Sequence, residues 1–451
     1  MELGSQESRA ADLPRHQPTG SCLASSALSA VAGPTVVHGN VGDHSLVHSL
    51  LRAVQQGPSY EDFITWLDEP SYEAADRLLI KHGPQIVAHV QVLHRTAWFD
   101  GVKLPTCGVQ DLAVLPEFAQ LGYDRLLLSA AEKAMRESQT ILSIAWSDRP
   151  EIFRACGWKD ACVWGYSQVN MGDILAHLES QTVPASRRSR GLKIRMWRHV
   201  ELDALRTVYR DCASQYWGAV YRAEHYWQWL TGRKAHSEIL VAVAGRDDWE
   251  HLETEPRIVG YAVTRGPKVL ELCCLPEYAR VAPRLLVRAC QDAVERDFHT
   301  LTLHTPASDP LHELIVTAGG SWRTDERQVG AMVVKLLDPA RWVEAIYPVL
   351  RRRMKGAGLA RPCQICFDTG EEHYRLVLTR RSSRLVADET AAAEVCCDPD
   401  CFSALLIGNL HVLRARDEGR LRVTDEEMLH KLTVLFPPAL FWQSQFDLPC
   451  S

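Results

Sequence analysis

The chain has 451 residues, of which 46% are hydrophobic and 24% are charged, which suits about three globular domains of ordinary soluble composition. Its formal net charge of −6 argues against a nucleic-acid-binding surface, and no apolar run is long enough to span a bilayer. The 14 cysteines, in a long chain without a basic segment near its start, predict reduced thiols and a cytoplasmic protein.

The beginning of the chain is predicted to be a tail followed by a first domain. Residues 1–34 are expected to be disordered, and the first domain is expected to occupy residues 35–182. Its predicted elements are a helix and two extended segments, at 45–55, 85–93 and 108–114. The segment 180–191 is polar, basic and proline-bearing, which is typical of an interdomain linker.

The second domain is expected to occupy residues 183–337. Its predicted elements are a strand, a helix, two hairpin strands around an acidic loop and a closing strand, at 192–196, 201–214, 238–243, 257–263 and 331–335. The aromatic residues between 216 and 229 allow two interpretations, a wall of a binding site or interface, and a helix packed into a core.

The third region, residues 338–451, has no counterpart in the rest of the chain. Its predicted elements are a helix, two strands and a second helix, at 338–350, 363–367, 374–378 and 424–435. Thr424 is expected to cap the last helix with its hydroxyl group. The spacing of the cysteines between 363 and 401 allows a zinc site. They lie in apolar, strand-like segments, which favours the alternative of buried free thiols, so no metal site is expected.

One stretch of sequence occurs twice. Leu-Pro-Glu at residues 115–117 recurs at 275–277, 160 positions later, and each copy continues into an apolar helical pattern and then a strand-like segment. The likeness in order, type and spacing extends over about 45 residues, which indicates two copies of one α/β domain.

In the first copy, a short loop precedes the helix. The backbone N–H groups at a helix N-terminus, together with the helix dipole, can hold a pyrophosphate without basic side chains. The residues predicted to surround such a group are Gln120, Leu121, Gly122, Tyr123 and Asp124. The second copy has no glycine here and carries Pro283, which lacks a backbone donor.

Two motifs resemble the GNAT acetyltransferase superfamily. Residues 114–117, Val-Leu-Pro-Glu, followed by Gly122, resemble its acyl-CoA loop, with Asp124 where a second glycine is common. Residues 152–158 resemble its later aromatic segment, and Phe153 occupies the place of a tyrosine that protonates the departing thiolate. The resemblance implies a mixed α/β fold, acetyl-CoA as co-substrate and a contact between Phe153 and CoA.

The order of the three regions over residues 35–447 resembles the Eis-type (enhanced intracellular survival) family. That resemblance implies two tandem GNAT-like domains, the second degenerate, followed by a sterol-carrier-protein-like α/β domain. It implies acetylation of a primary amine of a small molecule or a lysine, assembly as a homo-oligomer (a hexamer), and no nucleic-acid or membrane partner. In such enzymes the carboxylate at the chain's own end acts as general base, which here implies Ser451.

Acetyl transfer to an amine also needs a base and a group that polarises the thioester carbonyl. The backbone N–H groups of Ala113 and Val114 are the candidates for polarisation, and Asp111 is the candidate base beside Ser451. Strand alternation predicts that Asp111 and Ala113 lie on one face. The rival interpretation is a protein that keeps the scaffold and binds acyl-CoA or another ligand without chemistry, because Phe153 cannot donate a proton and Asp124 is acidic.

Overall fold

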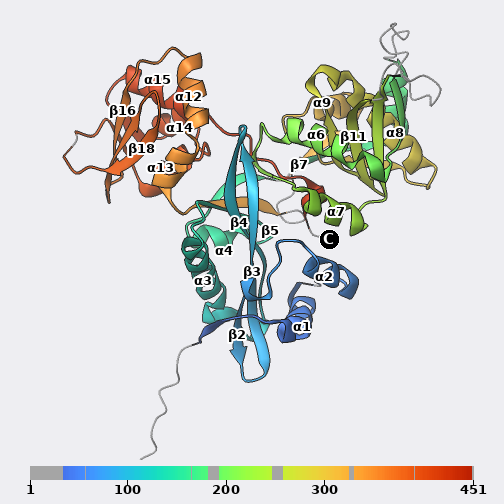
Figure 1. Ribbon diagram of the computed structural model, residues 1–451, viewed down its shortest axis with the longest axis horizontal. Helices are drawn as coiled ribbons and strands as arrows, with labels where there is room; N and C mark the ends of the chain where they lie inside the picture. The colour runs from blue at the N-terminus through green and yellow to red at the C-terminus, as the bar shows by residue number, and fades with distance from the viewer. Residues whose placement is uncertain are drawn as a thin grey trace, which may run out of the picture. The chain divides into compact units, whose positions relative to one another are not determined.

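The computed structural model describes residues 34–55, 57–163, 165–180, 192–245, 257–324, 330–390 and 392–448 (Figure 1). These residues form three β-sheets accompanied by helices, so the predicted mixed α/β class is confirmed. All three sheets belong to one compact unit that begins at Val36. The predicted tail up to residue 33, and the linker residues 181–191, lie outside the described residues. Within the described part, no helix is both long and apolar enough to cross a membrane.

The first sheet has the strand order β1-β2-β3-β4-β5-β15-β6, and β9 pairs with the carboxyl-terminal end of β3. The strands are β1 (Val36–His38), β2 (Arg77–His82), β3 (Gln85–Phe99), β4 (Val102–Val114), β5 (Leu142–Ser147), β6 (Lys159–Val163), β9 (Trp217–Val220) and β15 (Ala331–Leu336). The accompanying helices are α1 (His44–Gln55), α2 (Tyr60–Leu67), α3 (Tyr123–Glu137) and α4 (Pro150–Ala155), with 3-10 helices η1 (Val41–Asp43), η2 (Ala74–Asp76) and η3 (Pro116–Leu121). The two predicted extended segments are confirmed within β3 and β4, which both run further.

The second sheet has the order β14-β7-β13-β12-β11-β10-β8. Its strands are β7 (Gly165–Asn170), β8 (Leu192–Met196), β10 (Glu238–Ala244), β11 (Arg257–Arg265), β12 (Lys268–Cys274), β13 (Thr300–Leu303) and β14 (Ser321–Thr324). The helices are α5 (Met171–Ser180), α6 (Leu202–Ala213), α7 (Glu224–Gly232), α8 (Ala282–Val294) and α9 (Pro310–Thr317), with 3-10 helices η5 (His199–Glu201) and η6 (Pro276–Val281). The predicted antiparallel pairing of 238–243 with 257–263 is confirmed by β10 and β11.

Each half of the repeat gives one strand to the other half. Strand β7 lies in the second sheet between β13 and β14, whereas β15 lies in the first sheet between β5 and β6. The prediction that residues 331–335 close the second domain is therefore wrong. The two acceptor positions are equivalent because the halves are copies of one fold, and strand alternation does not distinguish between them.

The third sheet has the order β18-β17-β16-β19-β20. Its strands are β16 (Cys363–Asp368), β17 (His373–Leu378), β18 (Ser383–Ala387), β19 (Val395–Cys397) and β20 (Leu421–Val423). The helices are α11 (Pro339–Ala345), α12 (Tyr347–Gly356), α13 (Pro399–Leu406), α14 (Val412–Asp417) and α15 (Glu426–Leu435), followed by the 3-10 helix η7 (Gln445–Asp447).

Two predictions for this region are corrected. The helix expected over 338–350 is two helices that meet at Ile346, because Pro348 lacks an N–H and fits only in the first turn of α12. The last helix begins at Glu426 and is capped by Asp425, whose Oδ1 accepts the Met428 N–H at 2.8 Å, so Thr424 is not the cap.

Three groups of buried side chains hold these sheets. One lies between the first sheet and helices α1, α3 and α4. A second packs on the second sheet and includes Trp442 and Phe446 near the end of the chain. The third joins the carboxyl-terminal sheet to residues of β5 and β15, so that region packs against the first sheet. The aromatic residues between 216 and 229 belong mainly to these cores, since Trp217, Tyr226, Trp227 and Trp229 are all buried.

Candidate active site

Strands β4 and β5 separate part-way along the first sheet. Their parallel pairing runs from Thr106 and Leu142 to Val109 and Ala145. Beyond that point both strands continue, β4 to Val114 and β5 to Ser147, without further pairing between them in the described residues. Backbone groups along this opening are therefore available to a ligand where no side chain binds them.

A β-bulge in β4 lies beside the opening. The register between β3 and β4 shifts so that Val90 faces extra residues of β4, and Asp111 adopts a φ of 55°. The prediction that Asp111 and Ala113 share a face is wrong because the extra residue breaks the alternation. Asp111 borders a cavity, whereas Ala113 is fully buried in the core that includes α3.

Side chains from neighbouring elements hold this strained backbone. Arg77 Nη1 donates to His89 Nε2 at 2.8 Å, so the other ring nitrogen of His89, Nδ1, carries the proton and donates to the Asp111 carbonyl oxygen at 2.8 Å. Arg149 Nη2 donates to the next carbonyl, that of Leu112, at 3.0 Å. A non-glycine residue at positive φ costs about 1–3 kcal/mol and persists only where its surroundings fix it.

The titratable groups of this network have shifted pKa values. Burial holds the pKa of His89 well below its usual value, and Arg77 lowers it further, so the ring is neutral as the hydrogen bonds require. Burial raises the pKa of the Asp111 carboxyl, against smaller opposing effects of Arg77 and Gln110. The half-buried Asp111 is therefore a stronger base than an exposed aspartate.

The direction of the backbone N–H groups follows from the pairing of β4 with β3. The Leu115 N–H donates to the Val87 carbonyl on β3 at 2.9 Å. Successive N–H groups of a strand alternate in direction, so that of Ala113 also points toward β3, and that of Val114 points toward the opening beside β5.

The predicted pyrophosphate loop forms the start of α3. Gly122 has a φ of 72° and separates η3 from α3, and no side chain caps the helix at this residue. Gln120 and Leu121 are exposed, whereas Tyr123 is buried and hydrogen-bonded through its hydroxyl to His82 Nε2 at 2.9 Å.

The Asp124 carboxylate is turned onto its own helix. Its Oδ1 accepts the N–H of Arg125 at 2.8 Å, which occupies one of the donors that a phosphate could use. The second copy differs, because η6 leads directly into α8 with Pro283 in the first turn and no left-handed residue between them.

A cavity of about 690 Å³ opens from the bulge. Its walls are residues of α2, β2, β3, β4, β9, the end of β5, the start of α4 and the carboxyl-terminal residues from 443 to 448. Phe153 borders it, is buried, and packs edge-on against Trp158. The Ser147 hydroxyl, at the end of β5, also borders the cavity. The charged residues of the wall are Arg77, Arg95, Arg149, Asp62, Asp111, Asp148 and Asp447.

The end of the chain is anchored where it passes the cavity. Gln443 accepts from Trp146 Nε1 at 2.8 Å and donates to the Gly218 carbonyl at 2.9 Å, which joins β5 to β9. Asp447 is paired with the fully buried Arg222. The predicted base Ser451 lies outside the described residues, of which Leu448 is the last.

Sequence reasoning missed Arg77, His89, Arg149 and Arg222. The signal for His89 was present, because it is a polar residue within the apolar run 86–90. The three arginines have no comparable signal. Within the described residues, no three His, Cys, Asp or Glu side chains come together as a metal site would require.

The comparisons with known proteins agree with this geometry. A family model for the acetyltransferase (GNAT) domain matches residues 39–161. No curated protein sequence matches the chain.

Three solved structures share the fold over most of the chain. A GCN5-related N-acetyltransferase from Anabaena variabilis has a TM-score of 0.67 at 14% identity, over 91% of this chain and 98% of that one. Another from Kribbella flavida has a TM-score of 0.65 at 16% identity, over 92% and 97%. Eis1 from Mycobacterium abscessus has a TM-score of 0.60 at 12% identity, over 91% and 99%. Residues 39–161 therefore match the acetyltransferase (GNAT) domain, and the three solved structures have the same fold over most of the chain.

Proposed function

We propose that the chain transfers an acetyl group from acetyl-CoA to a primary amine of a small molecule or a lysine. The observation that carries this proposal is the opening between β4 and β5, which meets a fixed bulge and a cavity bordered by Asp111. An amine acceptor must reach a thioester beside a base, and these features meet at one place.

The residues that would hold acetyl-CoA follow from the same geometry. The start of α3, with Gln120, Leu121, Gly122, Tyr123 and Asp124, would face the pyrophosphate. The pantetheine arm would lie in the opening, where unpaired strand groups can receive it. The co-substrate supplies an activated carbonyl, and the Val114 N–H would donate a hydrogen bond to its oxygen.

In this proposal Asp111 removes a proton from the ammonium form of the acceptor. The free amine then attacks the thioester carbonyl, a C–N bond forms and the C–S bond breaks. The raised pKa of Asp111 brings this base closer to neutral pH, where general bases are most effective. The terminal carboxylate of Ser451 remains the alternative base.

The departing thiolate needs no tyrosine in this scheme. Phe153 offers only an apolar ring to the cavity. An alkyl thiol such as that of cysteine ionises near pH 8.5, about two units above histidine, so a thiolate can depart and take its proton from solvent. The Ser147 hydroxyl, on the cavity wall, would be a protein source of that proton.

The proposal is tested by calorimetric titration of acetyl-CoA into the purified protein, with CoA as control, followed by release of free thiol on addition of amines. Micromolar binding and amine-dependent release support it. Absence of binding at millimolar acetyl-CoA contradicts it.

A second function, binding of acyl-CoA or another ligand without chemistry, is favoured by one observation. Asp124 places a carboxylate at the helix start that would receive the pyrophosphate, and it already occupies the Arg125 N–H. This function is supported if the protein binds acetyl-CoA tightly but no added amine causes release of free CoA thiol at any pH between 6 and 10. Amine-dependent release of thiol would exclude it.

Further properties belong to the same proposal. We expect a cytoplasmic protein that assembles as a homo-oligomer, a hexamer by resemblance, which analytical ultracentrifugation tests. A sterol-carrier-like role for the third region stays a prediction. Its five-stranded sheet and helices are compatible with a scaffold.

A further inference from the structure

Arg95 borders the cavity with hydrogen-bond donors that have no acceptor. It lies on β3 opposite Thr106, one of the residues of the cavity wall. Its Nε and Nη2 atoms are buried and have no hydrogen-bond partner among the described residues. Buried donors without acceptors are rare in folded proteins and require an explanation.

Arg222 shows how this chain satisfies a buried guanidinium. Its Nε and Nη2 donate to the two oxygens of Asp447, each at 2.9 Å, and Nη1 and Nη2 donate to Glu271 at 2.9 and 2.6 Å. The edge formed by Nε and Nη2 therefore receives a carboxylate in Arg222. The same edge of Arg95 is the one without a partner, and its two parallel N–H groups match a planar oxyanion.

The acidic groups near Arg95 are already used elsewhere. Glu69 accepts the Ser71 hydroxyl with both oxygens, and Asp447 is paired with Arg222. Burial alone would lower the pKa of Arg95, but Tyr226, Glu69 and Asp447 raise it, so the guanidinium keeps its charge. These groups stabilise the charged form of Arg95 electrostatically, but they accept no hydrogen bond from its Nε and Nη2 atoms.

The cavity wall carries charges of both signs, three arginines and four aspartates among the described residues. One of these aspartates, Asp447, is paired with Arg222, which it shares with Glu271. A ligand with one positive and one negative group finds partners of both signs on this wall. A purely cationic amine leaves Arg95 without an acceptor.

We propose that the acceptor amine carries a carboxylate remote from the amino group, and that Arg95 binds this carboxylate through its Nε and Nη2 edge. This inference rests on the proposed function, since it assigns a substrate class to the same cavity. The guanidinium borders the cavity, so rotation about the terminal torsions of the side chain presents the edge to the ligand.

The length of the acceptor follows from the strand. Thr106, opposite Arg95, and Asp111 are five residues apart on β4, about 16 Å of extended strand, and the arginine side chain reaches over part of that distance. The amine and the carboxylate are therefore several methylene groups apart. An ω-amino carboxylate or a lysine-like chain fits, and an α-amino acid is too short.

The test compares acetylation of 6-aminohexanoate with that of its neutral isostere 6-aminohexanamide. The wild-type protein is expected to prefer the carboxylate in kcat/KM by about ten- to hundredfold, the effect of one bidentate charged hydrogen-bond pair. Arg95→Met is expected to lose this preference and to turn over the carboxylate and the amide with similar kcat/KM. Arg95→Lys, which keeps the charge but not the donor edge, is expected to recover only part of it.

The controls separate this inference from the proposed function. Arg384→Met, on the exposed face of β18, must leave the preference intact. Equal turnover of both probes by wild type and Arg95→Met overturns the inference and leaves the function standing.

Absence of turnover with either probe counts against the function. The inference is then decided by calorimetric binding of 6-aminohexanoate in the presence of CoA. Binding that Arg95→Met abolishes supports it, and absence of binding overturns it. Arg95→Gln serves if the Met variant fails to fold.

Discussion

The two copies of the repeated segment place equivalent carboxylates in opposite surroundings. Glu271 lies 160 positions after Asp111, the spacing of the repeat, and occupies the equivalent place on β12. Asp111 sits on a bulge with positive φ and borders the cavity. Glu271 is fully buried and paired with Arg222.

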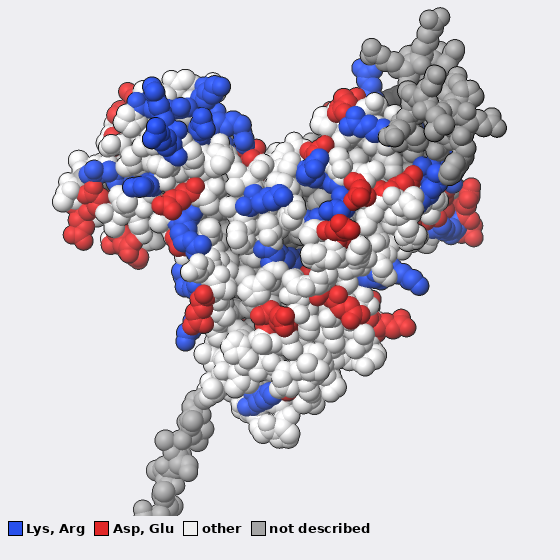
Figure 2. All heavy atoms as spheres, viewed as in Figure 1, with Lys and Arg blue, Asp and Glu red and all other residues white. Residues whose placement is uncertain are grey.

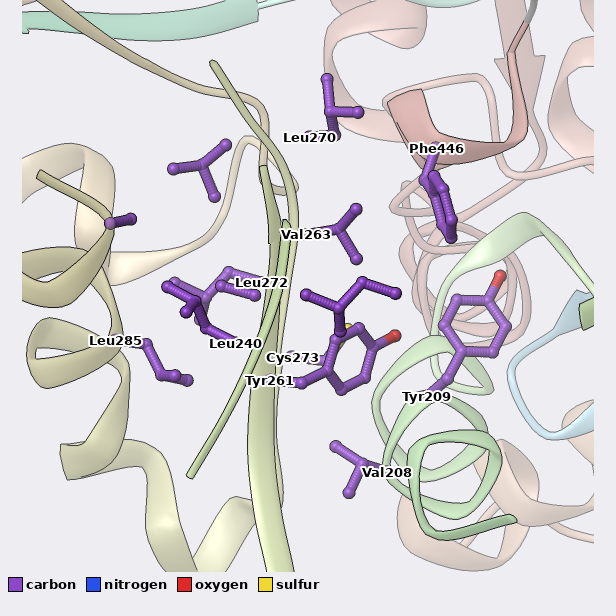
Figure 3. Close-up of a cluster of buried hydrophobic side chains, with 14 of the residues drawn as sticks. Val208, Tyr209, Leu240, Tyr261, Val263, Leu270, Leu272, Cys273, Leu285 and Phe446 are labelled. Carbon is purple, nitrogen blue, oxygen red and sulfur yellow. The ribbon is translucent and has the colours of Figure 1, made fainter. Parts of the chain in front are cut away.

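The difference comes from the end of the chain. Phe446 is fully buried in the core of the second half, on the same side of the sheet as Tyr209, while Leu285 lies on the other side (Figure 3). Asp447 shares Arg222 with Glu271, and η7 packs against β12. In the second half the chain's own end therefore occupies the face that is open in the first half.

The distribution of charged side chains on the surface also differs between regions. Lys and Arg side chains gather over the carboxyl-terminal region around α12, whereas acidic and basic side chains are mixed elsewhere on the same face (Figure 2). Around the cavity, acidic and basic side chains both lie on the elements that form its wall.

The strongest test of this comparison is substitution at the two equivalent positions. Asp111→Asn is expected to lower kcat/KM by about 10²- to 10⁴-fold, the usual contribution of a general base, with little change in melting temperature. The rise of activity with pH through the raised pKa of Asp111 should disappear with it. Steady-state kinetics between pH 5 and 9 measure both effects.

Glu271→Gln is the matched control. It should lower the melting temperature and leave the pH profile unchanged, because its carboxylate is paired in the core. Equal loss of activity in both variants, or none in Asp111→Asn, would contradict the assignment of the base.

Substitution of Arg222, the cation that Glu271 and Asp447 share, tests how much these ion pairs stabilise the second half. Arg222→Met leaves Glu271 and Asp447 buried without a cationic partner, which should destabilise the protein by about 3–5 kcal/mol. Differential scanning calorimetry should show a lower transition. The triple change Arg222→Met, Glu271→Gln and Asp447→Asn should recover part of the loss, and no recovery would show that the charges are not its cause.

Much of the fold could be predicted because it follows from local pattern. The helix at 202–213 and the hairpin of β10 and β11 were visible as apolar periodicity, and the repeat indicated two related halves. The exchange of β7 and β15 could not be predicted, because both acceptor positions suit either strand. Pairing partners are decided by long-range packing that a strand's own residues do not specify.

The site was predicted in part for the same reason. Asp111 was singled out, but the alternation rule placed it on the wrong face, because a bulge depends on both strands and on the residues that fix it. Those residues, His89 and Arg149, come from separate elements and reach the bulge only in the folded chain. Arg95 had no sequence signal, since its importance lies in a partner that it lacks.

A smaller effect is expected at the start of α3, where the two copies also differ. Asp124→Gly removes a negative charge from the predicted pyrophosphate site and frees the Arg125 N–H. Acetyl-CoA affinity should rise about two- to fivefold, which corresponds to the 0.3–1 kcal/mol of a charge at a helix end. Calorimetry measures it, with Glu137→Gly at the other end of α3 as control. Unchanged affinity would place the pyrophosphate elsewhere.

The smallest effect concerns one histidine in each half. The Asp76 carboxylate and then the Cys107 thiol raise the pKa of His94 to about 10, whereas burial, Lys268 and His312 lower that of His304 to about 3. Because the folded pKa of His94 lies above the unfolded value near 6.5, its stabilising contribution is complete below pH 6.5 and is lost as pH rises through about 10. The pKa of His304 is shifted the other way, so its effect lowers stability as pH falls from about 6.5 toward 3.

NMR of ¹³C-labelled histidines should therefore show a midpoint near 10 for the resonance of His94 and no titration above pH 4 for that of His304. Loss of the first resonance in His94→Gln assigns it. Asp76→Asn should shift its midpoint downward, because the His94 Nε2 to Asp76 Oδ1 contact of 3.4 Å is the largest cause of the shift. Midpoints near 6.5 for both histidines would show that His94 is not held in its charged form at neutral pH. The two halves would then differ only in the surroundings of Asp111 and Glu271.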